Sequence, residues 1–84
     1  MDLAKAEQVI LARFWERCLR AGGVQAGYGM RRQAIELAPG APGLAAADIG
    51  TALAAMVEKG WLKVNAAGTW YFLTAEGAEK VKAA

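Results

Sequence analysis

Glycine and proline divide this chain into segments that are each long enough for one or two regular elements. Gly22-Gly23, the segment from Pro39 to Gly43, and Gly60 each break a stretch that could otherwise continue as a helix. A chain of 84 residues buries only about 60% of its unfolded surface on folding, which is enough for one core. The sequence therefore predicts a single domain over residues 1–84.

The first segment, from Leu3 to about Ala21, has the periodicity of an amphipathic helix. Its apolar side consists of Leu3, Ala6, Ile10, Leu11, Phe14, Trp15 and Cys18. Glu7 and Arg17 lie at the edge of this side. Cys18 is the single cysteine and cannot form an internal disulfide, so we expect it to be a small core residue.

The next segment, Val24 to Gly29, has no helical period and is expected to be a linker with at most a very short extended stretch. A second helix is expected from Met30 to Ala38, where Pro39 ends it because the residue before proline is pushed away from helical geometry. Its buried face would consist of Met30, Ala34, Ile35, Leu37 and Ala38.

A third helix is expected from Ala45 to Lys59, since Ile49, Leu53, Met56 and Val57 share one helical face. Two segments rich in aromatic and β-branched residues follow, Trp61 to Val64 and Trp70 to Leu73. The residues between them favour a turn, which predicts a β-hairpin.

Thr74 is suited to cap a last helix that runs to about Ala83. The three tryptophans, Trp15, Trp61 and Trp70, are expected to pack between the first helix and the hairpin, with one of them partly exposed. The elements together predict an α+β fold.

Two stretches of this chain have a familiar order of residues. Residues 49–62 read Ile-Gly-Thr-Ala-Leu-Ala-Ala-Met-Val-Glu-Lys-Gly-Trp-Leu, and residues 71–77 read Tyr-Phe-Leu-Thr-Ala-Glu-Gly. Both stretches resemble those of winged helix-turn-helix regulators. The resemblance implies a small winged helix domain with three helices, a two-stranded β-hairpin wing and a short C-terminal helix. It also implies DNA binding, with the third helix in the major groove, and a role as a transcriptional regulator.

The residue types on the presumed DNA-reading helix do not match the usual base readers. Its outward positions are Ala47, Asp48, Gly50, Thr51, Ala54, Ala55 and Glu58, whereas bases are usually read by Arg, Lys, Asn or Gln. On the DNA-binding interpretation Ala47, Thr51 and Ala54 would face bases. Phosphates would be held by Arg31 and Arg32, with Lys59 and Lys63 beside the wing.

A second interpretation is a protein-interaction module that keeps the winged helix scaffold without binding DNA. Its contact residues would be Arg13, Arg17 and Arg20 on the first helix and Ala55 on the third. The arginines could equally form a solvated face paired with Glu16 and Glu36. A homodimer through Val9 and Leu19 on the outer side of the first helix is compatible with both interpretations.

Several classes of function lack the residues that they need. The sequence has no histidine, no clustered acid pair and no glycine-rich phosphate loop, so we expect no catalysis, no metal and no cofactor. No apolar run approaches the roughly 18 to 20 residues that span a bilayer. A net charge of +2 neither requires nor forbids nucleic acid. We therefore expect a cytoplasmic binding protein with DNA or protein as its partner.

Overall fold

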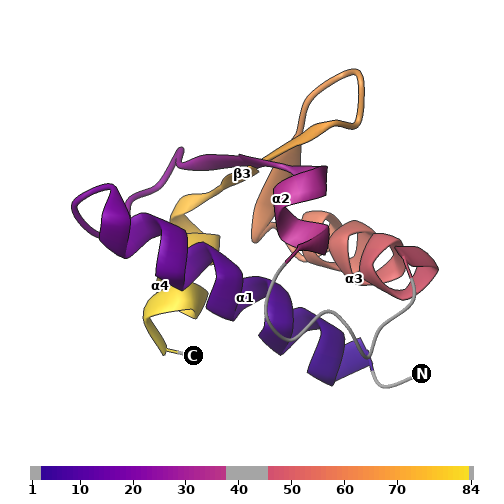
Figure 1. The fold of residues 1–84 in the computed structure, drawn as a ribbon, viewed down its shortest axis with the longest axis horizontal. Coiled ribbons are helices and arrows are strands. Elements are labelled where there is room, and N and C mark those ends of the chain that lie inside the picture. Colours follow the sequence, from indigo (N-terminus) through magenta and orange to yellow (C-terminus); the bar gives the residue numbers. More distant parts are fainter. Residues whose placement is uncertain (1–2, 38–45, 84) are drawn as a thin grey trace.

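The computed structural model describes residues 3–37 and 46–83 (Figure 1). Its elements are α1 (Leu3–Arg20), β1 (Gly29–Arg31), α2 (Arg32–Glu36), α3 (Ala46–Glu58), β2 (Leu62–Val64), β3 (Trp70–Leu73) and α4 (Ala75–Ala83). The predicted α+β class is confirmed. The expected first, third and last helices and the expected hairpin are all present, with ends that differ by about a residue from the predicted ones.

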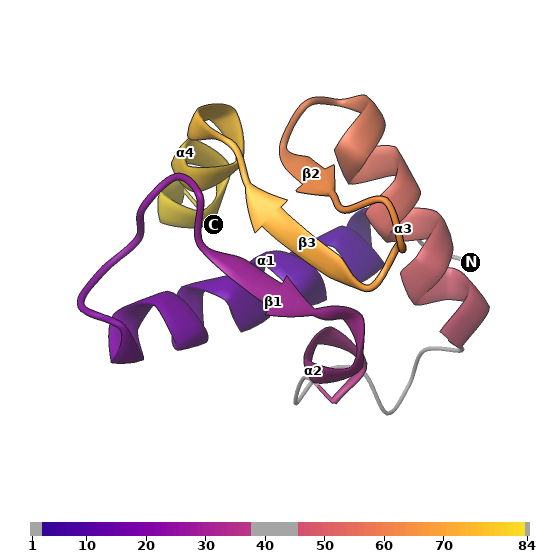
Figure 2. The same cartoon turned by 90° about the horizontal axis from the view of Figure 1, so that it is seen from above.

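The sheet has three antiparallel strands in the order β1-β3-β2, whereas the sequence predicted only the hairpin of two. Met30 pairs with Tyr71, and Lys63 pairs with Phe72. Side chains alternate between the two faces of a sheet. The inner face carries the buried residues Met30, Leu62, Tyr71 and Leu73, and the outer face carries Gly29, Arg31, Lys63, Trp70 and Phe72. Seen from above, α1 crosses behind the sheet (Figure 2).

The predicted second helix is wrong over its first residues. Met30 and Arg31 belong to β1, and α2 spans only Arg32–Glu36. Met30 is drawn into the sheet because its backbone pairs with Tyr71 while its side chain enters the core. Leu37, expected on the buried face, follows the helix and is 75% exposed. Ala38 and the predicted turn at 39–43 lie outside the described residues.

The core is formed mainly by α1 packed against α3, with contributions from α2, the sheet and α4. Its fully buried side chains are Ile10, Phe14, Cys18, Ile35, Leu53, Met56, Leu62 and Val81. Of the three tryptophans that were predicted to pack there, Trp61 packs against this core. Trp15 is 40% exposed, and Trp61 and Trp70 are half-buried. The ring of Trp61 also contacts two ammonium groups, those of Lys59 and Lys80.

Hydrogen bonds from side chains fix both ends of β3. Before the strand, Asn65 Oδ1 accepts from the backbone amides of Thr69 and Trp70 at 2.9 and 3.1 Å. After it, Thr74 Oγ1 accepts from the amide of Gly77 at 3.0 Å and donates to the carbonyl of Gly60. Thr74 is therefore the helix cap that the sequence predicted.

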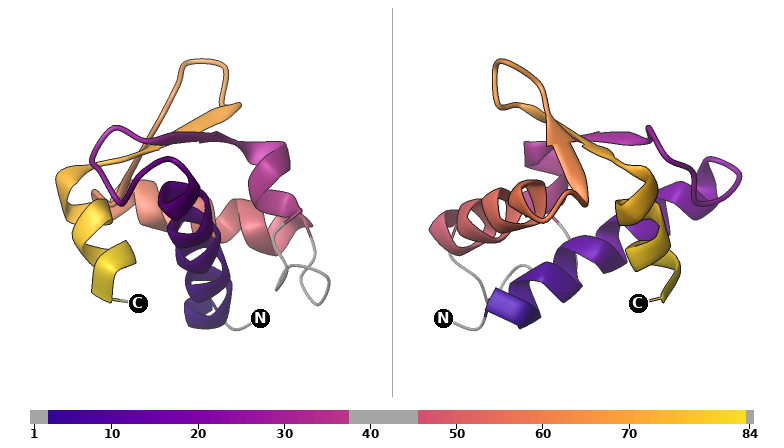
Figure 3. Two further views of the ribbon diagram at one scale, coloured as in Figure 1. Left: turned by 60° about the vertical axis from the view of Figure 1, so that its left-hand side comes forward. Right: turned by 180° about the vertical axis from the view of Figure 1, so that it is seen from behind.

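The hairpin loop projects from the body of the molecule on the side opposite to α4 and the first turns of α1 (Figure 3). Gly68 in this loop has a φ of 71°, a conformation that favours glycine. Within the described ranges, no helix combines the length and the apolar character needed to cross a membrane.

Cys18 is buried as predicted, and burial raises the pKa of its thiol above the ordinary value. We expect Ellman's reagent to label Cys18 much more slowly in the folded protein than in denaturant, because the thiolate is the reacting form. The folded state favours the neutral thiol over the thiolate. Its contribution to the free energy of unfolding is therefore complete at neutral pH and is lost as the pH rises through the raised pKa of the folded protein. Equal labelling rates with and without denaturant would contradict the burial.

Candidate nucleic-acid interface

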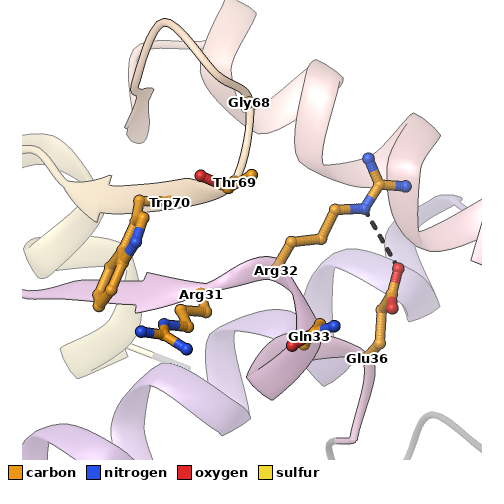
Figure 4. A pocket seen from close by; sticks show the side chains of 7 residues that line it. All are labelled: Arg31, Arg32, Gln33, Glu36, Gly68, Thr69 and Trp70. Atoms are coloured by element: carbon orange, nitrogen blue, oxygen red, sulfur yellow. Dashed lines mark hydrogen bonds and ion pairs between the residues drawn. The ribbon is translucent and has the colours of Figure 1, made fainter.

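The two arginines that the sequence assigned to phosphate contacts point in different directions. Arg31 is the last residue of β1 and Arg32 is the first of α2. The guanidinium of Arg31 lies over the ring of Trp70, 5.4 Å from its centroid, on the outer face of the sheet. Arg32 extends toward α3 (Figure 4). The two guanidinium groups of the predicted phosphate pair therefore point apart, although both residues line one cavity between α2 and the hairpin.

The exposed face of α3 is formed by small residues with the Arg32 guanidinium beside them. Ala47, Thr51 and Ala54 are exposed, and Gly50 lies in the same helical stripe. A Cβ built at Gly50 would lie only 2.7 Å from Nη2 of Arg32, so the guanidinium rests directly against this face. The structure thus places Arg32 beside the face of α3 that carries the three residues predicted to face bases.

Thr51 offers less to a ligand than its position suggests. Its hydroxyl donates to the carbonyl of Ala47 at 2.9 Å, one turn earlier in α3. The hydroxyl oxygen keeps its acceptor capacity, so Thr51 can accept a hydrogen bond while its donor is engaged. Glu58 is exposed further along the same helix and adds a negative charge. The exposed face of α3 is therefore small, and the cation that lies against it is Arg32.

A cavity of about 400 Å³ opens between α2 and the hairpin. It is lined by Arg31, Arg32, Gln33, Glu36, Gly68, Thr69 and Trp70 (Figure 4). The backbone amide of Arg32 donates to the carbonyl of Thr69 at 2.9 Å, which ties α2 to the end of the hairpin loop. Arg32 Nε donates to Glu36 at 3.2 Å, and this half-exposed pair leaves the remaining guanidinium nitrogens to a ligand.

The two lysines that were expected beside the wing also separate. Lys59 Nζ lies 2.7 Å from Oε2 of Glu7 on α1 and 4.5 Å from the centroid of the Trp61 ring. Glu7 has only 10% of its side chain exposed, so Lys59 compensates a nearly buried carboxylate. Lys63 is exposed on the outer face of the sheet. Lys59 is therefore paired with Glu7, whereas Lys63 lies on the same face of the sheet as Arg31.

The arginines of α1 do not form a uniform stripe. Arg13 has 14% of its side chain exposed, and its Nε donates to the carbonyl of Ala34 at 3.0 Å, linking α1 to α2. Arg20 is 69% exposed and lies 3.4 Å from Glu16. Arg17 is half-buried beside β1, where it lines a second cavity with Arg31 and Trp70.

Three further residues were predicted to contact a protein partner or a second copy of the chain, namely Ala55, Val9 and Leu19. Ala55 is half-buried on α3. Of the two residues expected at a dimer interface, Leu19 is 54% exposed, whereas Val9 packs against the core and is not on the outer side of α1 as predicted. Val9 turns inward because it neighbours Ile10 at the edge of the buried side.

An aromatic pair on the outer face of the sheet was missed by the sequence reasoning. The rings of Trp70 and Phe72 stack with centroids 6.2 Å apart and planes at 14°. The signal was present in β3, since Tyr71 and Leu73 alternate with these residues and a half-buried strand shows one face to solvent. Treating the tryptophans as core residues concealed it.

Comparisons with known protein families, with characterised proteins and with solved structures found no match to this chain. In residues 3–37 and 46–83, no group of three or more His, Cys, Asp or Glu side chains is arranged to hold a metal ion. The arguments below therefore rest on the residues and their geometry.

Proposed function

We propose that this chain is a winged helix domain that binds duplex DNA through the exposed face of α3 and acts as a transcriptional regulator. The single observation that carries the proposal is the Arg32 guanidinium resting against Gly50 in that face. The proposal involves no catalysis, no metal and no cofactor.

The arrangement of elements supports the winged helix scaffold. Helix α3 leads through Gly60 directly into the β2–β3 hairpin, and α4 follows with Thr74 as its cap. Strand β1 adds to the hairpin at β3 and leaves its loop free to project (Figure 3). These features keep α3 and the hairpin loop available to a duplex, as the resemblance implies.

The residue types set the expected strength of binding. Small side chains at Ala47, Gly50 and Ala54 allow a close approach of the helix to a groove, but they supply no bidentate hydrogen bonds to bases. Affinity would come from phosphates held by Arg32. We therefore expect weak, salt-dependent binding with a Kd on the order of 10⁻⁴ to 10⁻⁶ M, the range of non-specific contacts.

Replacing Arg32 by alanine should weaken duplex binding and lower the slope of log K against log salt by about 0.9, the value for one phosphate contact. The measurement is fluorescence anisotropy of a labelled mixed-sequence duplex at about 50 mM and about 200 mM salt. Arg20→Ala is the matched control, because it removes the same charge from an exposed position on α1.

Two results of this titration would contradict the proposal. One is the absence of binding at the lower salt concentration. The other is an equal loss in Arg20→Ala and Arg32→Ala, which would mean that only net charge matters.

A second candidate function is a protein-interaction module on the same scaffold. It is favoured by Trp15 and Leu19, which are 40% and 54% exposed and lie one helical turn apart on α1. Adjacent exposed apolar side chains are typical of protein contacts. Light scattering coupled to size exclusion tests the homodimer form, in which Leu19→Glu should convert a dimer to a monomer.

A further inference from the structure

The outer face of the sheet carries a second surface with a different chemistry from that of α3. We call it the aromatic sheet face and define it by Trp70 and Phe72 on β3, Arg31 on β1 and Lys63 on β2. The register places Arg31 opposite Trp70 and Lys63 opposite Phe72. Each ring therefore has a cation beside it on a neighbouring strand. No described helix lies over this face (Figure 2).

The position of the rings is built into the backbone. A Cβ at Gly29 would lie 2.5 Å from two atoms of the Phe72 ring, so the ring leans across onto β1 because Gly29 has no side chain. Trp70 is held at the start of β3 by the bond from its amide to Asn65. The rings stack at 14° on a strand paired on both sides. The aromatic surface is thus preorganised.

The charges of this face are all of one sign. The three strands contain two charged residues, Arg31 and Lys63, and both are exposed on this face. A third cation, Arg17, borders it at the cavity that it lines with Arg31 and Trp70. At the other cavity beside Trp70, Arg32 is paired with the carboxylate of Glu36. A surface that combines partly exposed aromatic rings with flanking cations is complementary to bases and phosphates together.

We infer that the aromatic sheet face binds single-stranded nucleic acid, stacking unpaired bases on Trp70 and Phe72 and holding the adjoining phosphates with Arg31 and Lys63. Bases paired in a duplex are stacked on each other and cannot reach these rings, so the ligand is a single strand or an unpaired end. Recognition is independent of base identity because every base has a π face. The inference does not depend on duplex binding by α3.

The present position of Arg31 is compatible with this role. Its guanidinium already lies over the Trp70 ring at 5.4 Å. An incoming base stacks on the ring more strongly than an exposed guanidinium does. Arg31 is exposed and can rotate away to a phosphate while the base takes its place. The Arg31 guanidinium therefore occupies, in the unbound protein, the position over Trp70 that a base would take.

The test is fluorescence anisotropy of labelled oligo(dT) and oligo(rU), each of about 12 nucleotides, at about 50 mM salt. We expect both to bind the unmodified protein, with Trp70→Ala weakening binding about 5- to 150-fold and Trp70→Phe restoring most of it. Tighter binding of one oligonucleotide identifies DNA or RNA as the favoured source, and equal binding supports the shared chemistry. Trp15→Ala is the control, because it removes an exposed tryptophan from α1.

A second variant covers the case in which Trp70→Ala does not fold. Arg31→Ala with Lys63→Ala changes two exposed side chains and should lower the slope of log K against log salt by about 1.4, the value for two contacts on a single strand. Arg20→Ala removes one positive charge from an exposed position on α1 and should leave oligonucleotide binding unchanged. The inference is overturned if neither oligonucleotide binds, or if the double variant binds both as the unmodified protein does.

Discussion

Replacing Gly77 by alanine is expected to destabilise the protein by about 3 kcal/mol or more. Alanine normally stabilises a helix interior relative to glycine by about 1 kcal/mol. Here a Cβ would lie 1.8 Å from the backbone carbonyl oxygen of Trp61, and neither backbone can yield without moving α4 or the start of the hairpin. For a chain of this length the total stability is on the order of 4 to 13 kcal/mol. Urea unfolding followed by circular dichroism measures the loss.

Gly50 provides the matched control for this substitution. A Cβ there meets only the free end of the Arg32 side chain, which can rotate away. Gly50→Ala should therefore be neutral or stabilise the protein by up to about 1 kcal/mol. If Gly77→Ala unfolded at the same urea concentration as the unmodified protein, the close contact between α4 and Trp61 would be wrong.

Phe14→Ala is the second large effect, with an expected loss of about 3 to 5 kcal/mol. Phe14 is fully buried on α1, within the packing of α1 against α3 that forms most of the core. Truncation leaves a cavity that neighbouring side chains fill only in part. The midpoint of urea unfolding should fall accordingly, with an unchanged denaturant slope if the folded state is otherwise retained.

Trp15→Ala is the control that distinguishes the effect of burial from that of aromatic character. Trp15 is larger than Phe14 but is 40% exposed. Trp15→Ala should cost well under half of the Phe14→Ala loss, since most of the indole is not enclosed by the core. A larger loss in Trp15→Ala would mean that α1 is rotated and that its sequence-based interpretation, with Trp15 in the core, was correct.

The elements that the sequence predicted are those with a complete local signal. Helices α1 and α3 have several turns of apolar periodicity, and Thr74 caps α4 with a bond to its own helix. Strand β1 could not be found in this way. It has three residues, too few to show alternation, and it exists because β3 supplies a partner and Gly29 makes room for Phe72.

The candidate site could be predicted only in part, because its geometry also depends on contacts between distant segments. The sequence identifies the cations but not the direction of each side chain. Arg31 and Arg32 are neighbours in sequence, yet a change from strand to helix turns their side chains in different directions. Lys59 is held by Glu7, 52 residues away, an ion pair that no local pattern indicates.

The tryptophans show how composition can mislead. Large aromatic residues dominate most cores, so three of them in a small chain suggested core packing. In this protein the aromatic residues of the core are Phe14 and Tyr71, and the tryptophans are only partly buried. Trp70 is consequently available as part of the aromatic sheet face. The ring of Trp61 is in contact with the ammonium groups of two lysines.

The most direct measurement is a titration of the ¹⁵N-labelled protein with a mixed-sequence duplex, followed by amide chemical shifts at about 50 mM salt. Binding through α3 predicts the largest changes at Gly50, Thr51 and Ala54, together with the side-chain Nε resonance of Arg32. Changes confined to α1, or no changes up to a several-fold excess of duplex, would contradict it.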